Sequence, residues 1–153
     1  ILRKPFPATK FSGRIARGAG VSLLRVSWTD GPIVALVKGI TARFEAGHFD
    51  GMTDSYNYAD ASDRTLLIDG KVYVAGTRYI FEDRTISPAF ARRLLAQVAA
   101  YFCETAPTIT EYIGYDGAAC WKMDNTNAML HGEWWTTYLH RAAENAALYA
   151  KAA

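Results

Sequence analysis

Phe49-Asp50-Gly51-Met52-Thr53-Asp54-Ser55-Tyr56 is the stretch that decides the fold of the N-terminal half. Asp50-Gly51 is a turn dipeptide, and the Asp54 and Ser55 side chains can hydrogen-bond to nearby backbone. An earlier turn, Trp28-Thr29-Asp30-Gly31-Pro32, must end a strand, because proline has no N–H for a sheet ladder. A helical pattern lies between the two turns. The chain therefore passes from strand to helix to turn.

The segment between the turns predicts a helix over 32–46. Thr29 or Asp30 can accept hydrogen bonds from the first helical N–H groups, and Pro32 suits the first turn. Gly47 is a candidate C-terminal cap. The apolar stripe at helical spacing consists of Ile33, Val37, Ile40 and Phe44.

Alternating residues on either side of glycine turns predict β-hairpins. The first joins residues 10–17 to 21–28 across Gly18-Ala19-Gly20, with Arg25 and one or both of Arg14 and Arg17 on one solvent face. The second joins residues 65–68 to 71–74 across Asp69-Gly70. Residues 77–86 form another strand, whose Tyr79 and Phe81 we assign to the core because aromatics at strand spacing are most often buried.

Two further helices are predicted in the second half of the chain. Ser87-Pro88 is a helix start, and the apolar stripe Phe90, Leu94, Val98 and Tyr101 ends before Pro107. From about Asn127 the chain favours one long helix. Its stripe would comprise Leu130, Trp134, Tyr138, Ala142, Ala146 and Tyr149.

These elements predict an α+β fold. We expect a mixed or mainly antiparallel sheet of about four to five strands, with the helices at 32–46 and 88–104 on one face and a long C-terminal helix. Residues 1–107 would form the α+β domain. Residues 108–153 would form an aromatic-rich helical extension packed on the same domain.

Composition indicates an ordinary folded protein. The chain has 153 residues, of which 50% are hydrophobic and 21% charged, enough apolar material for a core. No apolar run reaches the 18 or so residues of a membrane helix, so we expect no membrane partner. The few cysteines lead us to expect a cytoplasmic location. Cys103 and Cys120 are expected as buried or half-buried reduced thiols, with one disulfide as the alternative. The chain begins at Ile1 without Met, which leaves open a longer natural product.

Charge is distributed unevenly. Residues 1–29 hold six basic side chains and no acid, whereas the rest of the chain holds eleven basic residues against all 15 acids. Such a strip can contact phosphate or an acidic protein surface, or it can be an ordinary solvated face; both interpretations stay open. The six residues are Arg3, Lys4, Lys10, Arg14, Arg17 and Arg25.

The order and separation of the two turns give a resemblance. With Tyr79-Ile80-Phe81 leading to Ser87, they resemble the large polyvalent protein-associated domain family numbered 29, over roughly residues 6–90. Domains of this kind occur in large multi-domain proteins of phages and conjugative elements. The resemblance implies a helper or counter-defence role and supplies no catalytic residues. The remainder of the chain lacks such a resemblance, and we expect a free-standing protein.

Candidate chemistry is sparse. Asp50 and Asp54 could approach each other and, with Tyr56 and a basic group, form a catalytic pocket. The simpler interpretation is that both carboxylates accept hydrogen bonds from local backbone N–H groups in a turn. Asp30 lies at the far end of the helix, too distant for paired acid–base work. His48, His131 and His140 show no metal-ligand spacing. We therefore predict no catalytic residue, cofactor or metal.

The aromatic tail suggests a contact surface. Trp134 and Trp135 are adjacent, so one helix face cannot bury both. We select Trp134, Trp135, Tyr138 and Trp121 as candidate protein-binding residues, for a host protein or a second copy. Two function classes follow. One is a non-enzymatic counter-defence module of the anti-CRISPR or antirestriction type. The other is a nucleic-acid-binding accessory that uses Lys10, Arg14, Arg17 and Arg25. A small enzyme ranks third.

Overall fold

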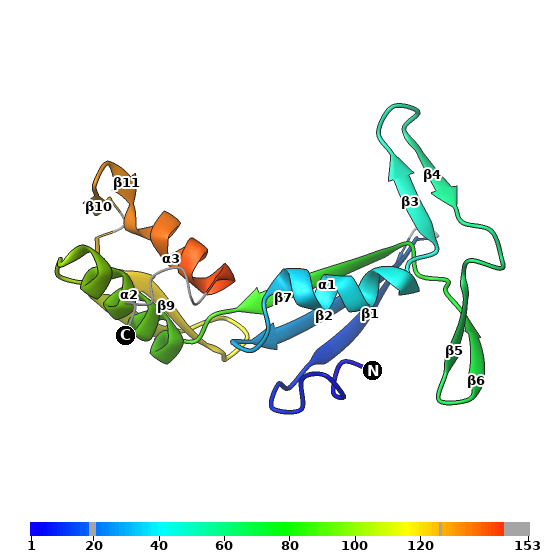
Figure 1. The fold of residues 1–153 in the computed structure, drawn as a ribbon, viewed down its shortest axis with the longest axis horizontal. Helices are drawn as coiled ribbons and strands as arrows, with labels where there is room; N and C mark the ends of the chain where they lie inside the picture. Colours follow the sequence, from blue (N-terminus) through cyan, green and yellow to red (C-terminus); the bar gives the residue numbers. More distant parts are fainter. Residues whose placement is uncertain (19–20, 126, 146–153) are drawn as a thin grey trace. The chain divides into compact units, whose positions relative to one another are not determined.

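The chain divides into two compact units. The computed structural model describes residues 1–18, 21–125 and 127–145, without the side chains of 16–18 and 21–22. Unit 1 covers Ile1–Arg84 and unit 2 covers Thr85–Ala153 (Figure 1). The division falls earlier than the boundary expected after residue 107. Each unit has its own apolar cluster.

Unit 1 is built on a three-stranded sheet. Strands β1 (Ser12–Gly18) and β2 (Val21–Thr29) form the predicted antiparallel hairpin, and β7 (Tyr79–Thr85) joins the other edge of β2. The expectation of four to five strands in one sheet is wrong. The remaining strands pair only with their neighbours in sequence, as separate two-stranded hairpins.

One helix covers one face of this sheet. Helix α1 (Val34–Thr41) continues into a short 3-10 turn, η1 (Ala42–Phe44), and it buries Val37 against Val26, Trp28 and Ile80. The helix is shorter than the predicted 32–46. Its N-cap is Ile33, which provides no side-chain hydrogen bond, so the expected cap by Thr29 or Asp30 is wrong.

Two hairpins project beyond the sheet (Figure 1). The first comprises β3 (Gly47–Asp50) and β4 (Ser55–Tyr58), and the second comprises β5 (Thr65–Ile68) and β6 (Lys71–Val74). Asp69 and Gly70 both have positive φ, at 48° and 76°, as a two-residue hairpin turn requires. Gly47 is a strand residue rather than a helix cap. A Cβ there would lie 2.0 Å from the Asn57 carbonyl oxygen.

Unit 2 packs two helices with short antiparallel strand pairs. Helix α2 (Pro88–Phe102) begins as predicted, because the Ser87 hydroxyl accepts a 3.2 Å hydrogen bond from the Phe90 N–H. Its Leu94, Leu95 and Val98 are buried with residues of helix α3 (Trp135–Glu144), so α2 belongs to this core and not to the face of the unit 1 sheet. The short strands are β8 (Ile109–Ile113) with β9 (Ala119–Met123), and β10 (Met129–Leu130) with β11 (Glu133–Trp134).

The long C-terminal helix expected from about Asn127 is wrong. His131 and Gly132 have φ of 47° and 84°, so the chain turns back there between β10 and β11, and α3 starts only at Trp135. Ala146 and Tyr149 lie outside the described residues. Cys103 and Cys120 are free thiols; Cys120 is half-buried as expected, whereas the expected burial of Cys103 is wrong because it is exposed at the end of α2. No helix in the described ranges has the length and apolar character needed to cross a bilayer.

Candidate binding surfaces

The turn after β2 is held by its own signature residues. Trp28 is buried, and its indole N–H donates to the Pro32 carbonyl at 2.9 Å. Arg84, at the end of β7, donates to the carbonyls of Asp30 at 2.8 Å and Gly31 at 3.1 Å. Since these carbonyls follow β2, the C-terminal ends of β2 and β7 lie at the same end of the sheet. The motif is therefore structural, a clasp between neighbouring strands.

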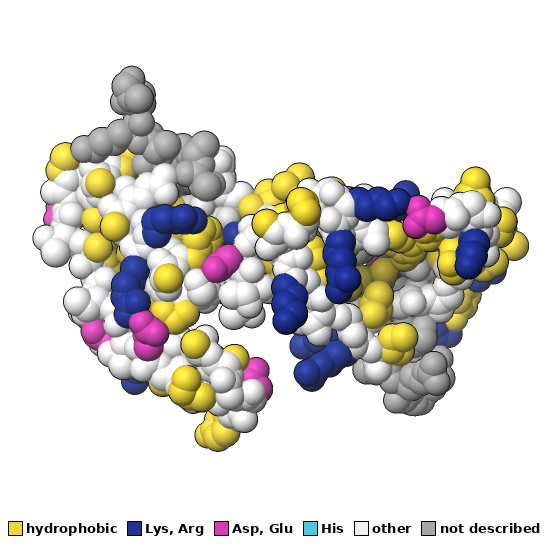
Figure 2. Space-filling view, turned by 90° about the horizontal axis from the view of Figure 1, so that it is seen from below, with side chains coloured by type: hydrophobic (Ala, Val, Ile, Leu, Met, Phe, Trp, Pro, Cys, Tyr) yellow, Lys and Arg dark blue, Asp and Glu magenta, His cyan; other side chains and the backbone are white. Residues whose placement is uncertain are grey.

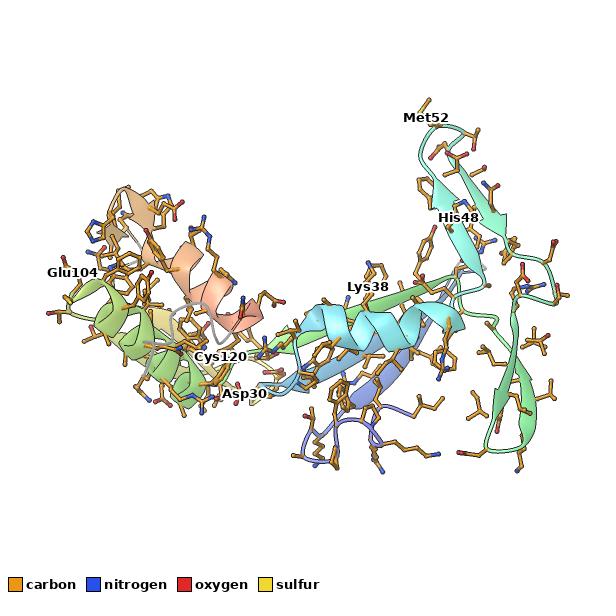
Figure 3. The ribbon with its side chains drawn as sticks, in the orientation of Figure 1. Asp30, Lys38, His48, Met52, Glu104 and Cys120 are labelled. Carbon is orange, nitrogen blue, oxygen red and sulfur yellow. The ribbon has the colours of Figure 1, made fainter. Side chains whose placement is uncertain are left out.

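The second turn is also satisfied locally. The Asp50 carboxylate accepts from the Met52 N–H at 2.9 Å and from the Thr53 hydroxyl at 3.0 Å. These two hydrogen bonds lower the pKa of Asp50, because they favour its charged form. Asp54 adopts a φ of 49° next to Thr53 in this exposed turn, and Met52 stands at the tip of the hairpin (Figure 3).

The predicted acids do not assemble into a catalytic or metal centre. Asp30 belongs to the β2 turn, whereas Asp50 and Asp54 belong to the β3–β4 turn. Among the residues the structure describes, no group of three His, Cys, Asp or Glu side chains has metal-binding geometry. His131 lies in a turn with its ring 5.2 Å from that of Phe102, whereas His140 lies on α3.

Four aromatic rings form a continuous row from β7 to β4. The consecutive centroid distances are 6.3 Å from Phe81 to Tyr79, 5.4 Å from Tyr79 to Tyr56 and 4.9 Å from Tyr56 to Tyr58. Phe81 is 44% exposed and Tyr58 is 52% exposed, so the assignment of Phe81 to the core is wrong. We call these four residues the aromatic row.

The Arg78 side chain lies over the two tyrosines at the β4 end of the aromatic row. Its guanidinium carbon lies 5.4 Å from the Tyr56 ring centre and 5.3 Å from that of Tyr58. Its Nε–H donates to the Tyr58 hydroxyl, and the Tyr56 hydroxyl donates to the Arg78 carbonyl at 2.8 Å. Burial, with a smaller contribution from the nearby Glu45 carboxylate, raises the pKa of Tyr56. Tyr56 is thus a neutral hydrogen-bond donor.

The basic residues lie beside this row on the open face of the sheet. Arg14 pairs directly opposite Arg25, and the Arg25 guanidinium binds the Asp83 carboxylate at 3.0 Å. Asp83 and Phe81 are two positions apart on β7 and so share that face. Lys10 is exposed just before β1, whereas the Arg17 side chain lies outside the described residues. In Figure 2, Lys and Arg side chains predominate over acids on the visible face of unit 1, at the right.

The candidate protein-binding aromatics are mostly internal. Trp135 and Tyr138 are buried in the unit 2 core, and the half-buried Trp121 donates its indole N–H to the Ile86 carbonyl at 2.8 Å. Only Trp134 of this set is largely exposed, at 45%, directly opposite the exposed Met129. One of the adjacent tryptophans is therefore buried and the other exposed, although Trp134 lies on β11 and not on the predicted helix.

A larger apolar surface lies on the β5–β6 hairpin. Leu67 and Val72 face each other across the hairpin and are 74% and 68% exposed. Val74 shares their face at 62% exposure, and Tyr73 is 49% exposed on the other face. The alternation in 71–74 predicted the strands, but sequence alone gives no sign that the outer face stays uncovered. Neither strand pairs with a third strand within the described ranges.

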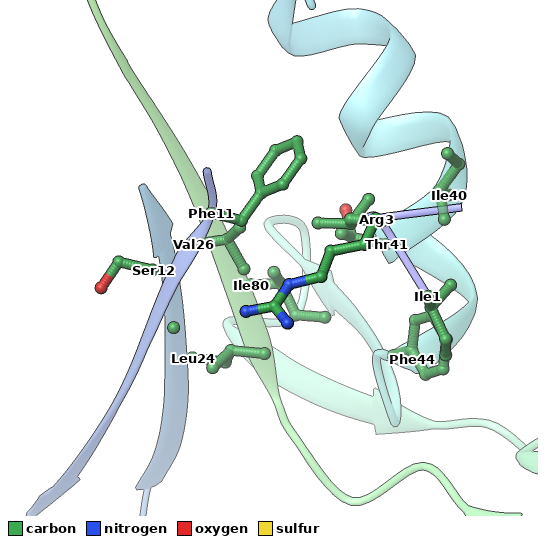
Figure 4. Close-up of a pocket in the computed structure, with 12 residues that line it drawn as sticks. Ile1, Arg3, Phe11, Ser12, Leu24, Val26, Ile40, Thr41, Phe44 and Ile80 are labelled. Atoms are coloured by element: carbon green, nitrogen blue, oxygen red, sulfur yellow. The ribbon is translucent and has the colours of Figure 1, made fainter. Parts of the chain in front are cut away.

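A pocket of about 520 Å³ opens between the N-terminal segment, α1 and the sheet. The Arg3 side chain extends across it toward the strands (Figure 4). The Thr41 hydroxyl is already bonded to the Val37 carbonyl and the Glu82 carboxylate. None of the predicted acids lines this pocket. Its walls are mainly apolar, from Ile1, Leu2, Phe11, Leu24, Val26, Ile40, Phe44 and Ile80.

Comparison with known families agrees with the two-turn signature. The model of a family described as large polyvalent protein associated domain 29 matches residues 1–87, more than half of the chain and close to the 6–90 expected from the motifs. Comparisons with curated proteins and with solved structures found no match. The matched segment ends near the boundary of unit 1 and includes the aromatic row and both projecting hairpins. The chain belongs to the large polyvalent protein associated domain 29 family, which is associated with phages and other mobile elements.

Proposed function

We propose that this protein is a non-enzymatic binding module with which a mobile element attaches to a host protein. The observation that carries the proposal is the exposed apolar surface of the β5–β6 hairpin. A two-stranded hairpin is marginal in water unless a further layer covers it. Leu67, Val72 and Val74 offer apolar area, and both strand edges offer unpaired backbone groups, which together suit addition of a partner strand.

The family association supports a role against host defence. Such a module would act in the bacterial cytoplasm as a counter-defence protein of the anti-CRISPR or antirestriction type, by occupying a component of the defence system. A steric block of this kind needs no chemistry of its own. The buried positions of Trp135 and Tyr138 favour the hairpin over the C-terminal aromatics as the contact surface, with Trp134 as a secondary contact.

Capture from host lysate tests the proposal. Purified protein and its Leu67→Asp/Val72→Asp variant would be incubated with bacterial lysate at high salt after nuclease treatment. We expect a discrete host protein with the parent chain and its loss with the double variant. Ile113→Asp is the matched control, because Ile113 is 71% exposed on β8 in the other unit.

The captured protein must then matter for defence. Phage plating on a host that carries the identified defence system should rise when the parent chain is expressed, and should not rise with the double variant. Equal capture by the parent chain and the hairpin variant would refute the assignment to β5–β6. A dimer that dissociates with the double variant, together with no captured protein, would assign this surface to self-association instead.

A further inference from the structure

The open face of the unit 1 sheet presents aromatic and basic side chains that do not belong to the β5–β6 hairpin. Helix α1 covers the face that holds Val26 and Ile80. Strand alternation places Tyr79, Phe81 and Asp83 on the opposite face, together with Arg25 and its cross-strand partner Arg14. The Arg25–Asp83 ion pair confirms that β2 and β7 present these side chains to the same side.

From these positions we propose that the aromatic row and its flanking arginines bind single-stranded DNA, with bases stacked on Phe81, Tyr79 and Tyr58 and phosphates held by Arg14, Arg25 and Arg78. Stacking on aromatic side chains beside a positive track is the usual way in which a sheet binds a single strand. The consecutive ring spacings of 6.3, 5.4 and 4.9 Å make the row continuous. Phe81 and Tyr58 are the exposed rings.

Charge favours a polyanion on this face. Arg14, Arg25 and Arg78 face one acid of the sheet, Asp83, which is already paired with Arg25. A further nearby acid is Glu45, whose carboxylate accepts a hydrogen bond from the Ile80 N–H at 2.8 Å. Lys10 and the rest of the acid-free stretch 1–29 add to the positive field.

Both tyrosine hydroxyl groups beside the row contact Arg78. The Tyr56 hydroxyl donates to the Arg78 carbonyl, and the Tyr58 hydroxyl accepts from the Arg78 guanidinium. The Tyr56 proton is thereby committed to the backbone, whereas the Tyr58 hydroxyl keeps its own O–H. We take DNA as the single strand, and the ribose 2′-hydroxyl, the group by which proteins select RNA, is tested directly with an oligoribonucleotide. Duplex DNA would present its phosphates to the arginines but keep its bases stacked inside, so the row would contribute nothing to duplex binding.

Fluorescence anisotropy with a labelled oligothymidylate of about 12 nucleotides tests the proposal. We expect binding at low salt, and the logarithm of the association constant should fall linearly with the logarithm of the salt concentration. A duplex of the same length should bind more weakly. Phe81→Ala should weaken binding about tenfold, in line with the loss of one stacked base. Arg14→Ala should lower the salt slope by about 0.7, the value for one phosphate contact on a single strand.

Matched variants separate this surface from general effects. Tyr112→Ala removes an aromatic that is 50% exposed on β8, and Arg43→Ala removes an exposed arginine on η1; both should bind as the parent does. Arg14 is exposed on β1, so its replacement tests the site even if Phe81→Ala unfolds the sheet. Leu67→Asp/Val72→Asp should keep DNA affinity, which makes this inference independent of the host-protein proposal.

Three results would overturn the inference. The first is no binding to the oligothymidylate at low salt. The second is equal affinity for single strand and duplex, which would remove any role for the aromatic row. The third is an equal loss of affinity in Phe81→Ala and Tyr112→Ala. A uridine oligoribonucleotide that binds about tenfold more tightly than the DNA would overturn the choice of DNA.

Discussion

The guanidinium of Arg84 donates to the Asp30 carbonyl across 54 positions of sequence and thereby joins the end of β7 to the turn after β2. The same guanidinium reaches the Gly31 carbonyl at 3.1 Å. Both acceptors belong to the signature turn of the family. These two hydrogen bonds hold the end of β7 beside the turn that follows β2, so residues far apart in sequence fix the same end of the sheet.

Replacing Arg84 with Met should destabilise unit 1 by about 1–3 kcal/mol, because two backbone carbonyls lose a charged donor. Arg84→Lys should recover only part of the lost stability, since an ammonium group cannot reproduce the planar guanidinium that donates to both carbonyls. Urea unfolding followed by tryptophan fluorescence measures the effect. Lys38→Met, on the exposed side of α1 (Figure 3), is the control and should change stability by less than about 0.5 kcal/mol. Equal effects of Arg84→Met and Lys38→Met would contradict the clasp.

Two glycines in unit 1 should respond to alanine in opposite directions. Gly47→Ala places a Cβ 2.0 Å from the Asn57 carbonyl oxygen, so β3 and β4 must separate, and we expect a loss of about 1–3 kcal/mol. Gly39 lies within α1, where an added Cβ would meet no atom within 4 Å, and Gly39→Ala should stabilise by about 0.5–1 kcal/mol. The melting temperatures of both variants, compared with that of the parent chain, test the two predictions. Stabilisation by Gly47→Ala would show that the β3–β4 backbone can move to accommodate the added Cβ.

The adjacent tryptophans should separate stability from surface function. Trp135 is only 4% exposed, and Trp135→Ala should cost about 3–5 kcal/mol through loss of the unit 2 core. Trp134 is 45% exposed, and Trp134→Ala should cost less than about 1 kcal/mol. Chemical denaturation measures both. Comparable losses would mean that Trp134 is as deeply packed as its neighbour.

The Lys4–Asp69 ion pair predicts a local pH response. The Lys4 ammonium lies 2.7 Å from the Asp69 carboxylate and lowers the pKa of that carboxyl. Because the pKa of Asp69 is lower in the folded protein than in the unfolded chain, the ion pair stabilises the fold at pH values above the ordinary pKa of about 3.9. This stabilisation is lost as the pH falls through the folded-state pKa. As pH falls through this lowered pKa, the N-terminal segment should therefore lose its ion pair with the β5–β6 turn.

NMR titration of the Asp69 carboxyl checks this expectation. The titration midpoint of Asp69 should lie at lower pH in the parent chain than in a Lys4→Met variant. Because the ion pair is exposed, high salt should screen it and make the two midpoints more alike. Identical midpoints in the two proteins at low salt would argue against the contact. Asp124 offers an internal comparison, since the Thr108 and Thr110 hydroxyls are the main cause of the lowered pKa of its carboxyl.

Sequence alone determined the local elements of this protein. Glycine and proline restrict or free the backbone over two or three residues, and so the hairpin across Asp69-Gly70, the Ser87 cap and the strand before Trp28 could all be predicted. The same chemistry identified the family. His131-Gly132 is one exception, because a helical apolar stripe and a positive-φ turn competed for the same residues. Gly47, a strand residue rather than the predicted helix cap, is another.

The tertiary structure decided which faces are buried. Period-two alternation marks two faces of a strand but not which one meets a helix, so Phe81 could be placed on its strand and yet assigned to the wrong side. The same holds for Leu67 and Val72, which are apolar and exposed, and for Trp135 and Tyr138, which are aromatic and internal. Burial depends on contacts between residues far apart in sequence. The elements of this protein are therefore local in origin, whereas its exposed and buried faces arise only from packing.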